Sequence, residues 1–165
     1  METKKILIPT DFSVKSLNLV KQAIETSREE KVDIVLLQGA YLPSSITEML
    51  FFSKRKLVKS FQSEEFNEAC KMLKNKYDSR INSFCVDVIT SKNNAYFQEY
   101  LLANGIDEIV VPNEDSLNFK GKNSFSPLPL FTKCKVKLNH LECSSVYEKA
   151  TTVREQISDL FFSRT

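Results

Sequence analysis

The 165-residue sequence has no apolar run near the roughly 18 residues that a membrane-spanning helix needs, and no apolar core of a secretion signal at its start. Its net charge is only +2, and its lysines are interspersed with acidic residues. A nucleic-acid-binding stripe and a polybasic membrane segment are therefore absent. The four cysteines lack Cys-x-x-Cys spacing, as is typical of reduced thiols. We expect a soluble, cytoplasmic protein that binds neither nucleic acid nor membranes.

The sequence also has little of what catalysis or metal binding requires. His140 is the only histidine, and Cys134 and Cys143 are its nearest thiols. If Cys134 and His140 share a strand, they lie roughly 20 Å apart and can neither bind one metal ion nor form a Cys-His catalytic pair. Ser124 and Ser126 have no histidine base placed beside them by the sequence. We therefore expect no catalytic residues, no metal site and no enzymatic activity.

The segment 4–13, KKILIPTDFS, joins a buried strand to an acidic turn. Ile6–Ile8 is apolar on both faces, which is typical of a central parallel strand, and Pro9 cannot continue the hydrogen bonding of such a strand. Thr10 and Asp11 therefore follow the carboxyl end of the strand. Ligands of open α/β sheets bind at that end.

Strands and helices alternate along the rest of the chain. Ser13 is predicted to cap a helix over about residues 14–28, whose inward side chains are Leu17, Val20 and Ile24. A continuous apolar strand follows at 32–37, then a loop over 39–45. Residues 46–79 are predicted to be mainly helical: Ser45 and Glu48 have capping-box spacing, and an inward stripe is formed by Phe66, Ala69, Cys70, Leu73 and Tyr77.

The second half of the chain continues this order. The segments 84–89 and 108–111 read as strands, and between them 94–104 reads as a helix that ends at Gly105, a residue suited to a left-handed cap. Parallel strands joined by helices require right-handed crossovers. The sequence therefore predicts an α/β fold with a doubly wound, five-stranded parallel sheet.

The opening turn and this order of elements resemble the universal stress protein family. Members of that family begin with a strand, a Pro-Thr-Asp or Pro-Val-Asp turn and a serine near the helix start, which Pro9, Thr10, Asp11 and Ser13 reproduce. The resemblance covers about residues 1–140. It implies the adenine-nucleotide-hydrolase-like fold.

The second motif of the ATP-binding members is largely absent. After the fourth strand they carry Gly, two residues, Gly, nine residues, Gly, then Ser or Thr. That spacing falls on Pro112, Asp115, Phe125 and Ser126, so only the hydroxyl is kept. Proline has no amide donor and phenylalanine adds bulk where the backbone of the family approaches phosphate.

Charge near this motif is also unfavourable for phosphate. Glu114 and Asp115 would repel a triphosphate. Lys120 and Lys122 could offset this repulsion, but without glycine amides to fix the phosphates we interpret them as solvated loop residues. The sequence thus predicts that ATP binding has been lost and that no cofactor is needed, with ATP or AMP bound through a rebuilt loop as the alternative.

A residual pocket can persist without the phosphate motif. The resemblance carries the ligand-holding role over to Thr10 and Asp11, although Asp11 could equally bond backbone amides near Ser13 and need no ligand. The candidate ligand-binding residues lie at strand ends in the expected sheet or at the remaining motif hydroxyl: Pro9, Thr10, Asp11, Gln38, Gly39, Val111 and Ser126.

The carboxyl end indicates association. Lys133, Lys135 and Lys137 alternate with apolar residues, which predicts a fifth strand at the sheet edge with one wet face. In the resembling family the final strand commonly joins two subunits, so the resemblance implies a homodimer, although a solvated monomer edge fits the lysines equally well.

We divide the chain into a universal stress protein-like domain, residues 1–141, and a helical extension, residues 142–165. Six apolar residues at helical spacing lie between Val146 and Phe161 in that extension. They predict packing on the domain or its mate, or else docking to another protein. Together these features predict a non-enzymatic, universal stress protein-like regulatory or stress-response protein; the alternative is an adenine-nucleotide-binding sensor.

Overall fold

The computed structural model describes residues 3–43, 45–112, 117–119 and 124–141. The strands are β1 (Thr3–Pro9), β2 (Lys31–Ala40), β3 (Ile81–Ile89), β4 (Glu108–Pro112), β5 (Ser124–Phe125) and β6 (Lys137–Leu141). The helices are α1 (Leu17–Thr26), α2 (Ile46–Leu50), α3 (Lys54–Phe61), α4 (Glu64–Lys76), α5 (Asn94–Ala103) and α6 (Leu128–Phe131). This order confirms the predicted alternation of strands and helices.

Five strands form a parallel sheet in the order β3-β2-β1-β4-β6. This confirms the five-stranded parallel sheet of the predicted α/β fold. The sixth strand, β5, pairs antiparallel with β2. The sequence did not predict β5, because two residues are too few to show a period.

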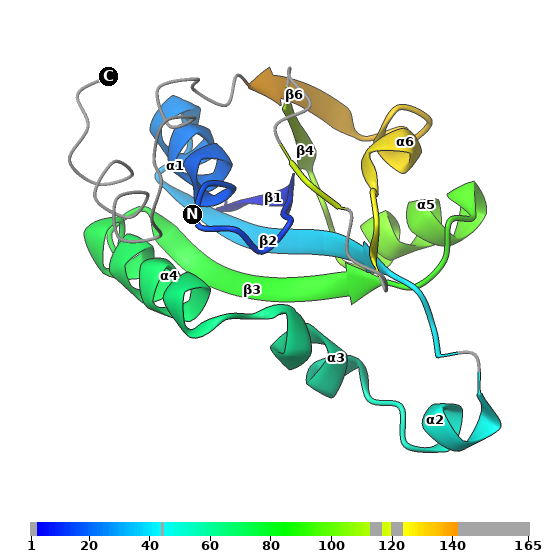
Figure 1. Ribbon diagram of the computed structural model, residues 1–165. Helices are drawn as coiled ribbons and strands as arrows, with labels where there is room; N and C mark the ends of the chain where they lie inside the picture. The colour runs from blue at the N-terminus through cyan, green and yellow to red at the C-terminus, as the bar shows by residue number, and fades with distance from the viewer. Residues whose placement is uncertain (1–2, 44, 113–116, 120–123, 142–165) are drawn as a thin grey trace.

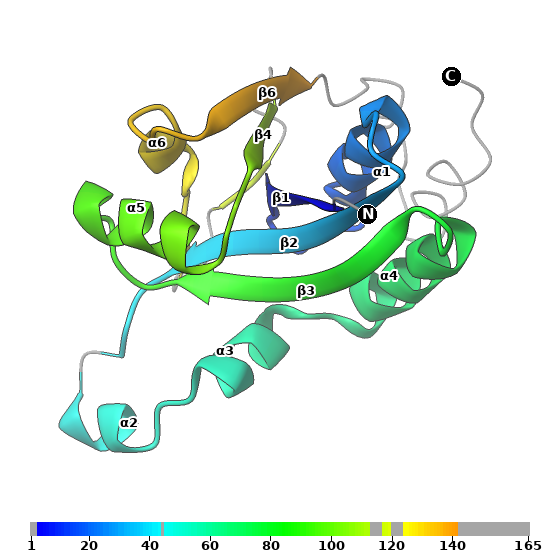
Figure 2. The same cartoon turned by 180° about the vertical axis from the view of Figure 1, so that it is seen from behind.

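Helices cover both faces of the sheet (Figures 1 and 2). On one face α1 and α4 pack against the even-numbered residues of β1 and β2, such as Ile6, Ile34 and Leu36. On the other face α5 and α6 pack against odd-numbered residues such as Leu7 and Val35. Because successive side chains of a strand point to opposite faces, strands buried on both sides must be apolar throughout.

The start of α1 corrects the sequence prediction. The helix begins at Leu17, not near residue 14, and its cap residue is Ser16, whose side chain makes no capping hydrogen bond. The residues before it form a tight turn, in which the Ser16 amide donates to the Ser13 carbonyl at 3.2 Å and the Leu17 amide to the Val14 carbonyl at 3.1 Å. The Ser13 Oγ also accepts from the Ser16 amide at 3.2 Å, which is the bond expected of a cap, but it caps this turn and not α1 itself.

Residues 46–76 form three helices, each preceded by a serine that accepts a backbone hydrogen bond. The predicted cap at Ser45 is confirmed, because its Oγ accepts from the Glu48 amide at 3.0 Å. Only α4 buries side chains, among them four of the five residues of the predicted stripe. The helices α2 and α3 bury none, and α2 lies on an arm that extends away from the sheet (Figures 1 and 2).

Three further boundaries bear on the predictions. Gly105 has a φ of 63°, which confirms the left-handed cap after α5. The strand β2 continues through Gly39 and Ala40, which the sequence assigned to a loop. The edge strand begins at Lys137, so the prediction that Lys133 and Lys135 belong to it was wrong; they follow α6 in a turn.

The predicted helical extension, 142–165, lies outside the described residues. None of the helices in the described part of the chain has the length and apolar character needed to cross a lipid bilayer.

Candidate functional site

The turn after β1 is held by buried polar contacts. The Thr10 amide donates to the Leu37 carbonyl on β2 at 2.9 Å, which anchors the turn to the neighbouring strand. The Thr10 side chain is fully buried, where its Oγ1 hydrogen-bonds to Ser16 Oγ at 2.9 Å and accepts from the Phe12 amide at 3.0 Å. Thr10 thus links the end of β1 to the start of α1.

Phe12 fixes the geometry of this turn. Its φ of 62° lies in the left-handed region, which is strained for a residue with a bulky side chain. The buried ring stacks on Phe61, with 5.5 Å between centroids, and meets the edge of Phe66 at 5.4 Å. Burial of the ring offsets the backbone strain, so the turn is held by the core beneath it.

Asp11 is fully engaged by its own chain. Its Oδ1 accepts from the Ser13 amide at 3.0 Å and from Ser13 Oγ at 2.5 Å, while its Oδ2 accepts from the Asn118 amide at 2.8 Å. Bonds from a carboxylate to nearby amides are what an aspartate at a turn makes without a ligand. Asp11 therefore also ties the segment after β4 to the turn after β1.

At the end of β2, the strand β5 occupies the place that β1 leaves. The pairing of β1 with β2 stops at Pro9 and Leu37, and two residues later Gly39 pairs with Phe125 and Ala40 with Ser124. The Phe125 ring lies directly on Gly39: a Cβ atom at Gly39 would meet Phe125 Cδ2 and Cε2 at 2.4 Å. Only glycine fits beneath this ring.

The Phe125 ring is covered in turn from the solvent side. Tyr41 packs on it, with 5.1 Å between ring centroids, and Lys92 Nζ lies 5.2 Å from its centroid. Phe125 is itself buried and belongs to the apolar cluster beneath α5 and α6. Phe125, which falls at the third glycine position of the family motif, is here part of the hydrophobic core.

Gln38 is the exception among these strand-end residues. It is 3% exposed, and its Oε1 has no hydrogen-bond partner within the described structure. An unpaired buried amide oxygen is costly, since it has lost water without replacing it. Among the candidate ligand-binding residues that the structure describes, Gln38 is thus the one with a buried side-chain atom that lacks a hydrogen-bond partner.

No protein-family model and no curated protein sequence matches the chain. Solved structures do match: the universal stress protein UspA from Lactobacillus plantarum has a TM-score of 0.55 and 10% identity over 84% of this chain and 97% of its own. The chain has the universal stress protein fold.

Two further structures have the same fold with small molecules in their descriptions. A universal stress protein in complex with cAMP matches with a TM-score of 0.53 and 14% identity over 86% of this chain and 98% of that one. A universal stress protein family protein from Arabidopsis thaliana with AMP bound gives 0.50 and 8% identity over 92% of this chain and 98% of that one. These likenesses confirm the fold that the opening turn and the order of strands and helices along the chain predicted.

The motif positions after β4 are only partly described. Pro112 closes β4 and Val111 lies half-buried beside it. Asp115, Lys120 and Lys122 lie outside the described residues. Ser126 Oγ accepts from the Leu128 amide at 3.3 Å, so the one hydroxyl that the motif keeps is used at the start of α6.

Three cavities of the described structure can be compared with the positions of the candidate ligand-binding residues. Their volumes are about 620, 560 and 300 Å³. Among the candidate ligand-binding residues, only Ser126 lines any of the three, and it lines the smallest, together with Lys92 and Lys133. The structure therefore does not gather the predicted site residues around one of these cavities.

The described residues contain no cluster of His, Cys, Asp or Glu suited to a metal ion. Cys134 lies in the turn before β6, so the strand geometry assumed for Cys134 and His140 was wrong. The Cys134 thiol lies 3.0 Å from the Phe131 carbonyl, and Cys143 lies outside the described residues.

The cavity of about 620 Å³ lies between α3, α4 and β3, and its lining includes Arg55, Lys59, Lys71 and Lys74. None of these residues was among the candidate site residues predicted from the sequence. One signal was present: the helix 54–61, KRKLVKSF, carries four cations and no acidic residue.

Proposed function

We propose that the protein is a non-enzymatic, cytoplasmic regulatory or stress-response protein that does not hold ATP at the carboxyl ends of its strands. The pairing of β5 with β2 is the observation that supports this proposal most directly. It seats the Phe125 ring on Gly39, so the chain itself fills the end of the crevice that a ligand of this fold class would use. No cofactor is then required.

The phosphate side supports the same proposal. Pro112 stands where the family motif has its first glycine, and proline offers no amide to a phosphate oxygen. Phe125 stands at the third glycine with its ring in the core. A triphosphate would have to displace a buried aromatic side chain, which stabilises the fold by about 1.5–3 kcal/mol when fully buried.

The turn after β1 supports the proposal as well. Both oxygens of Asp11 accept hydrogen bonds from the chain, and the Thr10 hydroxyl is buried between Ser16 and Phe12. A nucleoside would have to compete with these bonds for the Asp11 oxygens and break those that hold the Thr10 hydroxyl. Each broken bond costs about 1 kcal/mol unless the ligand replaces it.

Calorimetric titration with ATP and magnesium tests the proposal. We expect no saturable binding at low micromolar concentration in the wild-type protein. Saturable binding that disappears in Gln38→Leu would overturn the proposal, since Gln38 lies at the crevice. The matched control is Gln98→Leu, which makes the same change on α5.

The alternative function, an adenine-nucleotide sensor, is favoured by one observation. The buried Oε1 of Gln38 lacks a partner, and an amide oxygen accepts from groups such as the exocyclic amine of adenine. AMP lacks the outer phosphates that the altered motif cannot hold. Micromolar AMP or cAMP binding, abolished by Gln38→Leu and unchanged by Gln98→Leu, would establish this function in place of the first.

We further propose that two copies associate through β6. This strand lies at the edge of the described sheet, next to β4, and presents Lys137 and His140 to solvent. Light scattering should then give twice the mass of the chain, and His140→Pro should shift the protein toward monomer by removing a backbone donor from the strand. A monomer at high concentration would refute the proposal.

The arm that carries α2 offers the competing interface. Its exposed apolar side chains include Ile46 at 82%, Leu50 at 77% and Phe51 at 76% exposure. A dimer that persists in His140→Pro but dissociates in Phe51→Ser would place the interface on this arm and overturn the assignment to β6.

A further inference from the structure

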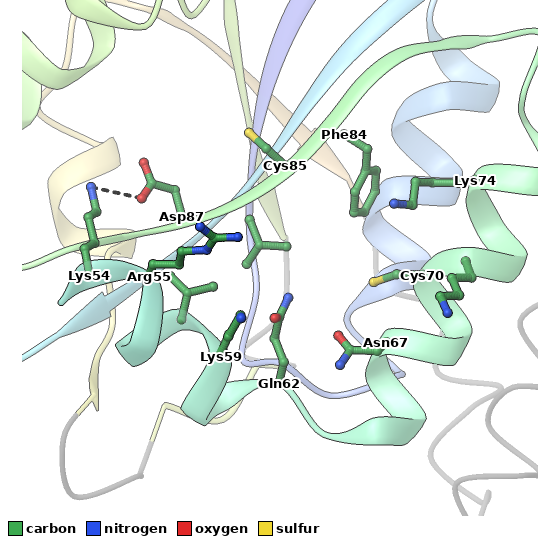
Figure 3. A pocket seen from close by; sticks show the side chains of 13 residues that line it. Lys54, Arg55, Lys59, Gln62, Asn67, Cys70, Lys74, Phe84, Cys85 and Asp87 are labelled. Atoms are coloured by element: carbon green, nitrogen blue, oxygen red, sulfur yellow. Dashed lines mark ion pairs between the residues drawn. The ribbon is translucent and has the colours of Figure 1, made fainter.

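The cavity between α3, α4 and β3 lies at the edge strand β3, whereas Phe125 lies on Gly39 at the end of β2. It has a volume of about 620 Å³ and is formed by α3, α4 and β3. Figure 3 shows Arg55 and Lys59 rising from α3 toward the strand, with Lys74 reaching from α4. A cavity of this size suits a small organic molecule.

The charge of the lining is strongly one-sided. Five cationic side chains line the cavity, namely Lys54, Arg55, Lys59, Lys71 and Lys74, and one carboxylate, Asp87. Asp87 is already committed, since its Oδ1 pairs with Lys54 Nζ at 2.9 Å and its Oδ2 accepts from the Tyr100 hydroxyl at 2.6 Å. In the described part of the chain, no carboxylate pairs with the other four cations.

The helix α3 is electrostatically unfavourable by itself. Its first turn contains Lys54, Arg55 and Lys56 and no acidic residue, although the amino end of a helix favours negative charge. Arg55 and Lys59 are four residues apart, so these like charges lie on neighbouring turns and repel. An eight-residue helix that buries no side chain is also too short to be stable alone.

Such a local conflict is resolved if an anion lies among these cations. Its negative charge would offset the repulsion between Arg55 and Lys59 and would favour the amino end of α3. Places where the local rules of helix stability are broken are where binding sites are expected. The unfavourable charge of α3 is thus a second observation, independent of the cavity, that indicates an anionic ligand.

The remaining lining indicates which anion. Val58, Phe84 and Val86 form an apolar wall, and Lys74 Nζ lies 5.4 Å from the centroid of the Phe84 ring. The side-chain amides of Gln62 and Asn67 add neutral hydrogen-bonding groups at the lower side of the opening (Figure 3). An inorganic ion would use only the cations and leave this wall in water.

We propose that this cavity binds a small organic phosphate, with the phosphate held by Arg55, Lys59 and Lys71 and the organic part against Phe84 and Val86. The guanidinium of Arg55 can bond two phosphate oxygens at once, and the lysines add charge. Binding stabilises α3. The site shares no lining residue with the crevice at the ends of β1 and β2, so it stands or falls independently of the proposed function.

The test uses the full-length chain and 1-naphthyl phosphate as probe, with inorganic phosphate and 1-naphthol as comparisons. The site variant is Arg55→Gln/Lys59→Gln/Lys71→Gln. The matched control, Lys31→Gln/Lys56→Gln/Lys135→Gln, removes the same charge from side chains that do not line the cavity, one of them on α3 itself. Calorimetry measures affinity, and hydrogen exchange measures protection of the α3 amides.

We expect 1-naphthyl phosphate to bind more tightly than inorganic phosphate or 1-naphthol. Added salt should weaken this binding, and bound ligand should slow hydrogen exchange of the α3 amides. Affinity should fall at least about tenfold in the site variant and less than about twofold in the control, because only the former removes charges within contact of the phosphate. A variant that fails to fold is recognised by circular dichroism, and Lys71→Gln alone, on the stable helix α4, then replaces it. Equal losses in site variant and control, or binding without protection of α3, would overturn the proposal.

Discussion

Replacing Gly39 with alanine tests the contact that closes the end of β2. The added Cβ would lie 2.4 Å from two ring carbons of Phe125 and 2.6 Å from its carbonyl oxygen. The ring could rotate away, but the carbonyl belongs to the backbone of β5, which pairs with Gly39 itself. The clash therefore cannot be relieved without moving β5 away from β2.

The expected loss of stability follows from two opposing effects. Overpacking of this kind costs about 1–3 kcal/mol. Replacing glycine by alanine within a strand returns roughly 0.5–1 kcal/mol by restricting the unfolded chain. The net loss in free energy of unfolding is then about 1–2 kcal/mol, and the melting temperature should fall by about 3–6 °C for a chain of this size.

Thermal denaturation and hydrogen exchange together check this reasoning. Gly39→Ala should increase exchange in residues 124–131 as well as lower the melting temperature. Gly105→Ala is the control, since it strains a residue with a φ of 63° but meets no atom within 4 Å, and it should leave exchange at 124–131 unchanged. Adding Phe125→Ala to Gly39→Ala should not restore protection, because it keeps the carbonyl contact and also removes a buried ring. An unchanged melting temperature and unchanged exchange in Gly39→Ala would refute the close approach of β5 to β2.

Three further outcomes follow from polar groups in the fold. Lys4 Nζ pairs with Glu108 Oε2 at 2.5 Å, and the two side chains are 21% and 5% exposed. Lys4→Met should lower the free energy of unfolding by about 3 kcal/mol in denaturant titration, because it leaves a buried carboxylate unpaired. The double variant Lys4→Met/Glu108→Leu should recover most of that loss. Burial raises the pKa of Asp33, but hydrogen bonds from Ser83 and its neighbour outweigh burial and hold that pKa below its ordinary value of 3.8. This stabilisation is present above pH 3.8 and is lost as the pH falls through the lowered pKa, so the stability of Asp33→Asn should decline less steeply than that of the wild type below about pH 4. Burial raises the pKa of the Cys70 thiol to about 12, so iodoacetamide at pH 8 should leave Cys70 unmodified in the native protein and alkylate it in urea, as peptide mass mapping would show.

The sequence predicted the arrangement of the sheet because buried parallel strands leave a direct signature. Segments such as Ile6–Ile8 and 34–37 are apolar on both faces, and the structure buries them between two helical layers. Pro9 and Gly105 marked the end of a strand and the end of a helix through backbone chemistry that depends on one residue alone. Local rules of this kind need no knowledge of distant segments.

The interpretation of Asp11 shows the limit of these rules. The sequence placed it correctly after β1 and left open whether it serves a ligand or the backbone. The structure adds its bond to the Asn118 amide, 107 residues away in the chain. A contact over that distance depends on how the segment after β4 returns to β1, and no local pattern encodes it.

The sequence by itself determined the α/β class and the succession of strands and helices, because each rests on the period, the turn chemistry or the residue type of a short segment. Only the tertiary structure decided that β5 fills the place beside β2, that Gly39 is needed beneath Phe125, and that the cations of α3 face those of α4 across a cavity. In each case the effect arises between side chains far apart in sequence. Which of these side chains come into contact depends on how whole helices and strands pack together, and no short segment of the sequence specifies that packing.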